Sequence, residues 1–310
     1  MNKRQKEIIG IQIESEKKLI EELKKIYEQA LDDINNRIAA LLARSDEENL
    51  KTIIYQLDYQ RALKKQISAI LDDLNARQFN TISEYLTKCY EMGFIGTLYD
   101  LQGQGIPLIF PINQEHVVRA LTVDTKLSKR LYTALGEDVE ELKKAIRSEL
   151  SRGISTSLSY ADIARNVKNR ASIGFNRSMR IVRTEGHRIT CAATYDAQHE
   201  AKEAGADIVK QWDSTLDKRT RKSHRELDGQ IKELDEPFIY MGYKAQFPSD
   251  FGVPSLDINC RCVLLQRARW ALEGEGSFTK WDSEHGGYLE LKEDTYEDFK
   301  KSYYKALDKK

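Results

Sequence analysis

The distribution of proline most constrains what this chain can fold into. All five prolines lie between residues 107 and 254, so the first hundred residues contain none. Proline ends or kinks a helix because it lacks the backbone N–H and its ring clashes with the preceding turn. A hundred residues without proline therefore leave room for long helices.

Apolar spacing in the same stretch also indicates helix. One set of apolar residues recurs every three or four positions, which is the period of one helical face. Ser45 followed by Glu48 has the form of a capping box and predicts the start of a second helix. A third helix is predicted over Ile82 to Met92. The apolar set comprises Leu19, Leu23, Ile26, Ala30, Ile34, Ile38 and Leu41.

We therefore expect residues 1–110 to form a helical hairpin or bundle. The apolar stripe fits an internal core, and self-association through these N-terminal helices is the alternative. Residues 93–111 are predicted to be a linker, because several glycines should break the helix there. Ile106–Pro111 is an apolar extended segment that either docks on the helices or meets a partner. The glycines are Gly93, Gly96, Gly103 and Gly105.

Helical periodicity resumes from Gln114 to about Ala204, with a second capping box at Ser159 and Asp162. Ile208 to Trp212 is predicted to be a strand, followed by turns and short strands. The polar tail ends in aromatic residues at helical spacing, which predicts a terminal helix. The fold class is therefore α+β, with a helical region (1–110), a helical plus short-strand module (112–265) and a C-terminal tail (266–310).

Charge is balanced overall but not locally. The chain has 49 basic and 49 acidic residues, whereas the stretch from Arg152 to Arg188 carries a net charge of +6. Such a stretch either contacts phosphates or forms a solvated helix face with acidic partners elsewhere. For duplex DNA bound without sequence preference, the candidate contacts are Arg165, Lys168, Arg170, Arg177 and Arg180.

Two further features concern the cellular setting. No apolar run approaches the roughly 20 residues of a membrane-spanning helix, and the first residues lack the apolar core of a secretory signal. The four cysteines are too few and too scattered for a disulfide scaffold, so reduced thiols in a cytoplasm are expected.

The densest chemical signal lies between Trp212 and Cys262. Cys260 and Cys262 are two residues apart, so on a strand both thiols would point to one face. With His224 they could supply three ligands of a zinc site, and Asp228 or Asp257 is the candidate fourth ligand. Two alternatives stay open. The cysteines could be reduced residues that pack a turn, or a thiol or zinc enzyme could be centred on His224, Asp228, Cys260 and Cys262.

Other residues of this stretch suggest structural duties. Asp228-Gly229 favours a tight turn with positive φ at the glycine. Trp212 is expected to anchor a core rather than to stack on a base. Upstream, the Arg183-Thr184-Glu185 step resembles a buried ion-pair element, with the acid paired along one helix and the threonine bonded to backbone.

The order of these residues resembles the Mu F-like family of phage head morphogenesis proteins. The resemblance covers about Gly153 to Leu265. The first residues that carry it are Arg183, Thr184 and Glu185, which precede an alanine-rich helix. The others are Trp212, His224, Asp228, Gly229, Asn259, Cys260 and Cys262.

The resemblance implies a minor head protein of a tailed phage rather than an enzyme. Such proteins are associated with the portal protein and packaged double-stranded DNA in head assembly or genome delivery. The implied location is the head interior near the portal, and the host cytoplasm during assembly. Some relatives carry a toxin or nuclease-like domain after this region. The chain ends within about fifty residues of Cys262, so we expect the form without it.

Overall fold

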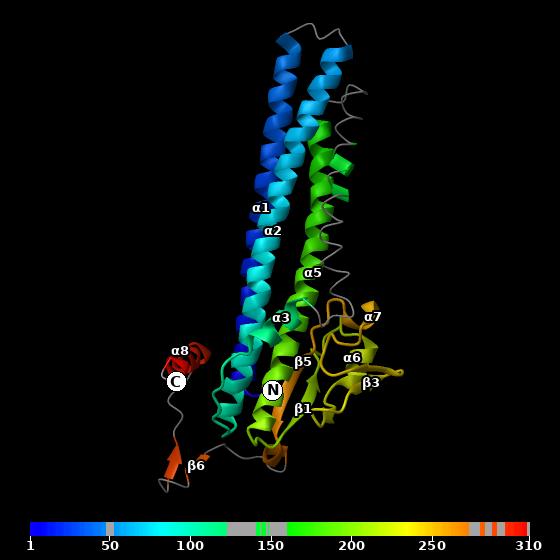
Figure 1. The fold of residues 1–310 in the computed structure, drawn as a ribbon. Coiled ribbons are helices and arrows are strands. Elements are labelled where there is room, and N and C mark those ends of the chain that lie inside the picture. Colours follow the sequence, from blue (N-terminus) through cyan, green and yellow to red (C-terminus); the bar gives the residue numbers. More distant parts are fainter. Residues whose placement is uncertain are drawn as a thin grey trace. The chain divides into compact units, whose positions relative to one another are not determined.

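The computed structural model confirms the α+β class, with long N-terminal helices followed by short antiparallel strands (Figure 1). It describes residues 1–47, 53–122, 141–142, 144–146, 148, 160–272, 280–282, 287–289 and 295–308. The helices are α1 (Lys3–Glu47), α2 (Ile53–Gly103), α3 (Gln114–Thr122), α5 (Tyr160–Glu203), α6 (Lys222–Leu227), α7 (Pro254–Asp257), the 3-10 helix η1 (Arg269–Leu272) and α8 (Tyr296–Leu307). The strands are β1 (Ile208–Asp213), β2 (Ile231–Lys232), β3 (Phe238–Tyr240), β4 (Tyr243–Ala245), β5 (Val263–Ala268), β6 (Lys280–Asp282) and β7 (Gly287–Leu289).

The chain divides into two compact units. The first unit contains residues 1–16, 85–129 and 183–310, and the second contains residues 17–84 and 130–182. Helices α1, α2 and α5 each contribute to both. The bounds 1–110, 112–265 and 266–310 expected from the sequence stay a prediction.

The second unit is a helical bundle. Its core joins Tyr27 and Ile34 of α1 to Leu71 of α2 and Val167 of α5. Inside it, the Tyr27 hydroxyl donates to Gln78 Oε1 at 2.5 Å and lies 2.9 Å from Ser178 Oγ. Of the apolar stripe predicted on α1, Ile26 is partly buried and the members Leu19, Leu23, Ala30 and Ile34 are buried. The side chains of Ile38 and Leu41 lie outside the described residues.

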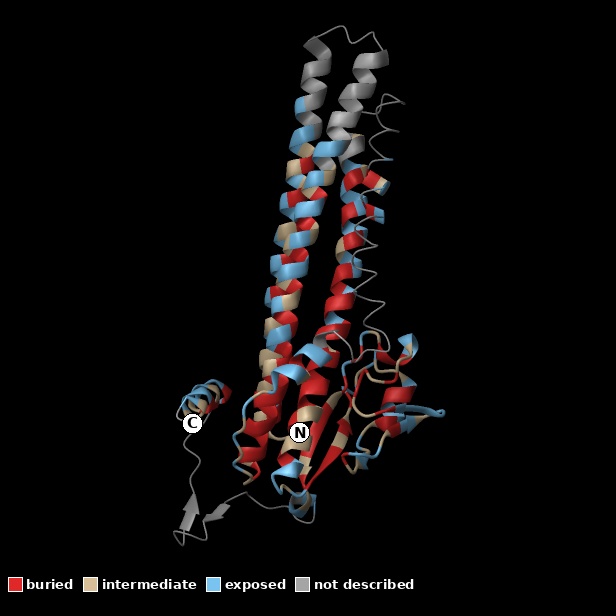
Figure 2. Cartoon of the chain, viewed as in Figure 1, coloured by how far each residue is buried: buried red, intermediate tan, exposed pale blue. Residues whose placement is uncertain are grey.

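The first unit is built on a three-stranded antiparallel sheet in the order β2-β1-β5. Trp212 of β1 pairs with Leu264 of β5, and four of the six residues in each of these strands are buried, which Figure 2 shows in red. The C-terminal half of α5 lies against β5, where Gln198 Nε2 reaches Gln266 Oε1 at 3.5 Å. The strand expected over Ile208–Trp212 is thus confirmed as β1.

Helix α2 is longer than the sequence analysis predicted. The third helix expected over Ile82–Met92 is part of α2, which continues through Gly93 and Gly96 to Gly103. Gly93 and Gly96 do not break the helix, because they allow a neighbouring segment to pack closely. A Cβ built on Gly93 would lie 2.4 Å from the carbonyl oxygen of Thr190 in α5, and one on Gly96 would lie 3.1 Å from Ile8. The helix does end at Gly103, and Gly105 lies in the following turn with a positive φ of 81°.

Two capping predictions have different outcomes. Ser45 does not start a helix, because α1 continues through it to Glu47, and its predicted partner Glu48 lies outside the described residues. Ser159 also lies outside them, but α5 begins directly after it, at Tyr160, with Asp162 in its first turn.

The apolar segment Ile106–Pro111 docks within the first unit. Ile106, Leu108 and Phe110 pack, partly buried, on a core cluster that includes Leu101 and Ile208. The docking interpretation is therefore confirmed over the exposed-loop one. The terminal helix is also confirmed as α8, in which Tyr303 donates to the carbonyl of Phe110 at 2.8 Å.

A buried carboxylate connects the N-terminus, the end of α2 and strand β5 within this unit. Asp100 accepts hydrogen bonds from the side-chain amides of Asn2, Gln5, Gln104 and Gln266, at 2.6 to 2.8 Å for the first three. Burial raises the pKa of Asp100, although all four amides act in the opposite direction. No helix in the described ranges combines the length and apolar character needed to cross a membrane.

Candidate functional site

Three side chains of the first unit converge on one buried point. His224 lies in α6, Cys260 follows α7, and Cys262 directly precedes β5. His224 Nδ1 lies 3.1 Å from Cys262 Sγ and 3.7 Å from Cys260 Sγ, and the three potential ligand atoms lie within 4.8 Å of one another. The three residues are only 1–5% exposed. The trio named from the sequence is therefore brought together.

A tight turn after α7 presents the two cysteines. The Cys260 backbone N–H donates to the Asp257 carbonyl at 3.1 Å. Asn259 adopts a positive φ of 54°, which asparagine tolerates better than most residues. Its backbone N–H donates to Thr184 Oγ1 of α5 at 3.2 Å. The Arg-Thr-Glu step and the Asn-Cys-Arg-Cys run, about 75 residues apart, thus meet through one hydrogen bond.

The orientation of His224 is set by a backbone carbonyl. His224 Nε2 lies 2.9 Å from the Leu256 carbonyl oxygen. Because a carbonyl can only accept, Nε2 must carry the proton of this bond. In the neutral ring, Nδ1 then holds a lone pair, and this is the nitrogen that faces both sulfurs.

Trp212 and Ser214 support the cluster from β1. Trp212 is fully buried among Phe238, Phe251 and the cysteines, so it serves as a core anchor. Its Nε1–H donates to Ser214 Oγ at 3.1 Å, and Ser214 Oγ donates to the His224 carbonyl at 2.7 Å. Ser214 Oγ also lies 3.2 Å from Cys262 Sγ.

The two thiols of the cluster differ in acidity. A hydrogen bond from the Cys260 thiol lowers the pKa of Cys262, and the His224 side chain adds to this shift, although burial opposes it. Burial raises the pKa of Cys260 well above its ordinary value.

The two acids considered as a fourth ligand lie on backbone amides instead. Asp228 follows α6, and its Oδ1 accepts from the Ser214 N–H at 2.7 Å. The Asp257 carboxylate accepts from the N–H groups of Phe251 and Val253 at 3.2 and 3.0 Å. Among the described residues the ligand cluster therefore consists of His224 and the two cysteines.

The turn after Asp228 has the expected backbone conformation. Gly229 has a φ of 75°, and its N–H donates to the Trp212 carbonyl at 2.8 Å. This turn returns the chain to β2, which pairs with β1. The Asp-Gly step therefore shapes the sheet edge next to the cluster.

The residues of the Arg-Thr-Glu step differ in burial. Arg183 is exposed and pairs with Glu16 at 2.8 Å. Glu185 is buried and pairs with Arg188, one turn further along α5, at 3.0 Å. Burial raises the pKa of Glu185, and Arg188 opposes that shift. Arg188 also donates to the Ala120 carbonyl at 2.7 Å, which ties α3 to α5.

The five candidate DNA contacts all lie on α5 within the second unit, and all are exposed. Acidic partners accompany at least two of them: Arg165 lies 2.9 Å from Asp162, and Arg177 lies 3.1 Å from Glu141. A helix turns by about 100° per residue, which places Arg170, Arg177 and Arg180 within about 80° of one another. These three form the more compact part of the basic surface.

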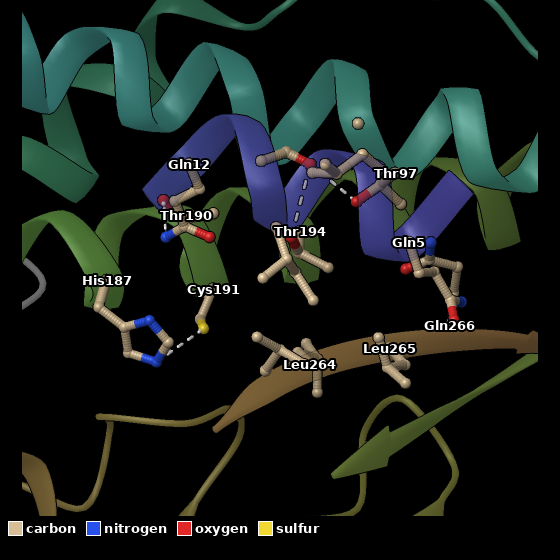
Figure 3. Close-up of a pocket in the computed structure, with 15 residues that line it drawn as sticks. Gln5, Gln12, Thr97, His187, Thr190, Cys191, Thr194, Leu264, Leu265 and Gln266 are labelled. Atoms are coloured by element: carbon tan, nitrogen blue, oxygen red, sulfur yellow. Dashed lines mark hydrogen bonds between the residues drawn. The ribbon is translucent and has the colours of Figure 1, made fainter. Parts of the chain in front are cut away.

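A small cavity lies between α1, α2, α5 and β5 of the first unit (Figure 3). Its volume is about 50 Å³, and its lining includes Gln12, Thr194 and Leu264. Such a volume suits one or two water molecules and is far below the several hundred Å³ of ordinary ligand pockets. His187, which the sequence does not single out, lines this cavity with its Nε2 3.7 Å from Cys191 Sγ. Burial lowers the pKa of His187.

Lys210 is a buried polar residue that the sequence analysis missed. It lies in β1, and its Nζ donates to the Leu234 carbonyl at 2.7 Å and to the carbonyl and side chain of Gln246 at 3.0 and 2.7 Å. Burial lowers the pKa of Lys210 to about 8. Strand alternation offered the signal, because it places Lys210 on the same face as Ile208 and Trp212.

Comparison of the sequence with known proteins finds a matching family model and related proteins. Residues 144–265 match the model of a family described as Phage Mu protein F like protein. The chain is 26% identical over 261 residues to Minor head protein GP7 of Bacillus phage SPP1, covering 82% of each protein. No solved structure matches the chain significantly.

Two other relatives are matched over a smaller share of their length. The chain is 34% identical over 273 residues to NAD(+)--arginine ADP-ribosyltransferase EFV of Enterococcus faecalis. That match covers 86% of this chain and 55% of the Enterococcus protein, so the chain spans about half of that relative. An uncharacterized protein of Haemophilus influenzae is 33% identical over 133 residues, which is 40% of this chain and 27% of that protein.

The matched segment contains both the Arg-Thr-Glu step and the cluster around Trp212, and the SPP1 relative extends the likeness into the helical region. The family model over residues 144–265 and the SPP1 relative together support a Mu F-like phage head family for this chain.

Proposed function

We propose that this phage head protein acts by binding: it associates with packaged double-stranded DNA without sequence preference, and with the portal. The observation that supports DNA contact is that the five candidate residues on α5, from Arg165 to Arg180, are all exposed. Basic side chains bind duplex DNA mainly by releasing counterions from its phosphates, a process that ignores base sequence.

The compact trio of Arg170, Arg177 and Arg180 carries this proposal. The three side chains lie close in angle on α5, so one DNA backbone can contact them together. To bind phosphate, Arg177 must give up its exposed ion pair with Glu141. Such a pair stabilises a protein by at most about 1 kcal/mol. Phosphate can therefore compete for Arg177 at little cost.

The test is DNA affinity as a function of salt. In the R170Q/R177Q/R180Q variant, affinity should fall equally on unrelated duplexes, and the salt slope should decrease by about 0.9 for each phosphate that the variant no longer neutralises. A matched control, K18Q/K24Q/K25Q, removes three exposed positive charges from α1. Equal losses of affinity in the two variants, or no loss in the first at low salt, would contradict a site on α5.

Portal association is the second half of the proposal, and it follows from the role that the resemblance to phage head morphogenesis proteins implies. Co-expression of the full chain with the portal protein of the same phage should yield a complex that survives size-exclusion chromatography. Mass spectrometry of virions before and after genome ejection then shows whether the protein stays in the head or leaves with DNA. Absence from purified virions would contradict a minor head role.

The name of the Enterococcus relative raises a second candidate, transfer of ADP-ribose from NAD(+) to arginine. One observation favours the binding role for this chain, because the match covers only 55% of that relative's length. Incubation with labelled NAD(+) and an arginine-rich acceptor should give no transfer, whereas labelled product would support the enzyme.

A thiol or zinc enzyme at His224, Asp228, Cys260 and Cys262 is the third candidate. A catalytic thiolate must meet its substrate, yet Cys262 is 1% exposed and Cys260 is 5% exposed. The Asp228 carboxylate is bonded to the Ser214 N–H rather than to the histidine ring, and the ring's second nitrogen bonds a carbonyl. These contacts support a structural cluster.

A further inference from the structure

We propose that His224, Cys260 and Cys262 bind a structural zinc ion that joins α6 to the turn before β5. The assignment is independent of DNA or portal binding. Zn²⁺ takes thiolate sulfur and imidazole nitrogen in tetrahedral sites, and these three side chains offer two sulfurs and one nitrogen.

The distances fit a common central ion. With Zn–S near 2.3 Å and Zn–N near 2.0 Å, tetrahedral ligands place sulfur and nitrogen about 3.5 Å apart. The measured separations of Cys262 Sγ and Cys260 Sγ from His224 Nδ1 are 3.1 and 3.7 Å, on either side of that value. Small side-chain rotations would therefore bring all three atoms to ligand distance.

The hydrogen bond of His224 Nε2 orients the ring for metal binding through Nδ1. Ligating histidines usually donate their second ring N–H to a carbonyl or carboxylate, which fixes the tautomer and the ring direction. His224 Nε2 donates to the Leu256 carbonyl at 2.9 Å. This leaves the Nδ1 lone pair aimed at the cysteines.

Charge also favours zinc at a buried site. Two thiolates and one neutral imidazole around Zn²⁺ sum to zero, so the occupied site would hold no uncompensated charge in the core. Isolated buried thiolates would not share this advantage. The fourth position goes to an oxygen, and Ser214 Oγ, 3.2 Å from Cys262 Sγ, is placed to supply it or to hold a water there.

The first test is the metal content of the full chain, purified under reducing conditions without a polyhistidine tag. We expect about one zinc per chain. The C260S, C262S and H224N variants should lose it. Cys89→Ser and Cys191→Ala change two other buried cysteines outside the cluster and should retain it.

A second measurement uses the wild-type protein, so it still tests the proposal if the variants fail to fold. The wild-type protein, stripped by a chelator and then titrated with Co²⁺, should develop thiolate-to-cobalt absorption at one equivalent, and its Tm should fall on stripping and recover with Zn²⁺. Three outcomes would overturn the assignment: no metal in the native protein and no Co²⁺ uptake, iron in place of zinc, or a Cys260–Cys262 disulfide found by mass spectrometry.

Discussion

The close approach of α2 and α5 at Gly93 gives a graded test of the fold. In Gly93→Ala, the new Cβ would lie 2.4 Å from the Thr190 carbonyl oxygen and 3.0 Å from Ala193 Cβ. Ordinary contact needs about 3.4 Å, so the two helix backbones must separate by about 1 Å. Gly10 in α1 is the matched control, because its Cβ would meet nothing within 4 Å.

The two substitutions should have opposite signs. Overpacking costs about 1–3 kcal/mol, and a backbone obstacle belongs at the upper end of that range. Replacing a helical glycine with alanine returns about 0.5–1 kcal/mol. Gly93→Ala should therefore destabilise the protein by about 2 kcal/mol, whereas Gly10→Ala should stabilise it by about 0.5–1 kcal/mol.

Gly186 and Gly103 should fall between these limits. A Cβ on Gly186 would lie 2.7 Å from the Tyr85 ring, and one on Gly103 would lie 2.7 Å from Arg4 Cδ. The arginine can move more easily than the buried ring, so Gly186→Ala should cost more. Urea unfolding followed by circular dichroism gives the series, with a constant m-value required for comparison. If Gly93→Ala is as harmless as Gly10→Ala, the helices do not approach as described.

Three further substitutions test buried polar groups. The pKa of Lys210 is lowered to about 8 from 10.5, so between those pH values the unfolded chain binds more protons. The stability of the wild type relative to Lys210→Met should thus rise with pH in that window, by up to about 3 kcal/mol, and a flat difference would refute the burial. Asp100→Ala leaves four side-chain amides without their acceptor and should lower the unfolding free energy by at least about 2 kcal/mol in urea. Tyr27→Phe removes the bonds to Gln78 and Ser178 and should cost about 1 kcal/mol, so an unchanged midpoint would contradict this buried network.

The sequence predicted the long helices well and their ends poorly. Missing prolines and three-to-four spacing are local signals, and both describe α1 and α2. Glycine was misjudged because its cost inside a helix, about 1 kcal/mol, is small enough for tertiary packing to offset. The packing partner of Gly93 is Thr190, almost a hundred residues away, and nothing near Gly93 in the sequence announces it.

The residues of the candidate site could be predicted from the sequence, but their hydrogen-bond partners could not. Both thiols do meet at one point, as the Cys-x-Cys spacing suggested, but they lie in a turn before β5 and not on a strand. The family motif supplied His224. The ring direction of His224, however, is set by the Leu256 carbonyl, a backbone group that any residue type would provide. The prediction of Asp228 or Asp257 as a fourth ligand was wrong because it also depended on backbone positions. Asp228 and Asp257 bond to backbone N–H groups, whose positions only the fold determines.

The contacts of the motif residues show which of them have a structural role and which are left for another role. Thr184 holds the Asn259 N–H, Asp228 holds the Ser214 N–H, and Trp212 fills the core, so each of these residues has a structural duty that explains its type. The two cysteines and His224 differ, because packing alone would not require two sulfurs and an oriented lone pair at one buried point. A framework built from hydrogen bonds and a tryptophan already closes the turn. The cluster is therefore the part of the motif that packing does not explain, and metal analysis examines it directly.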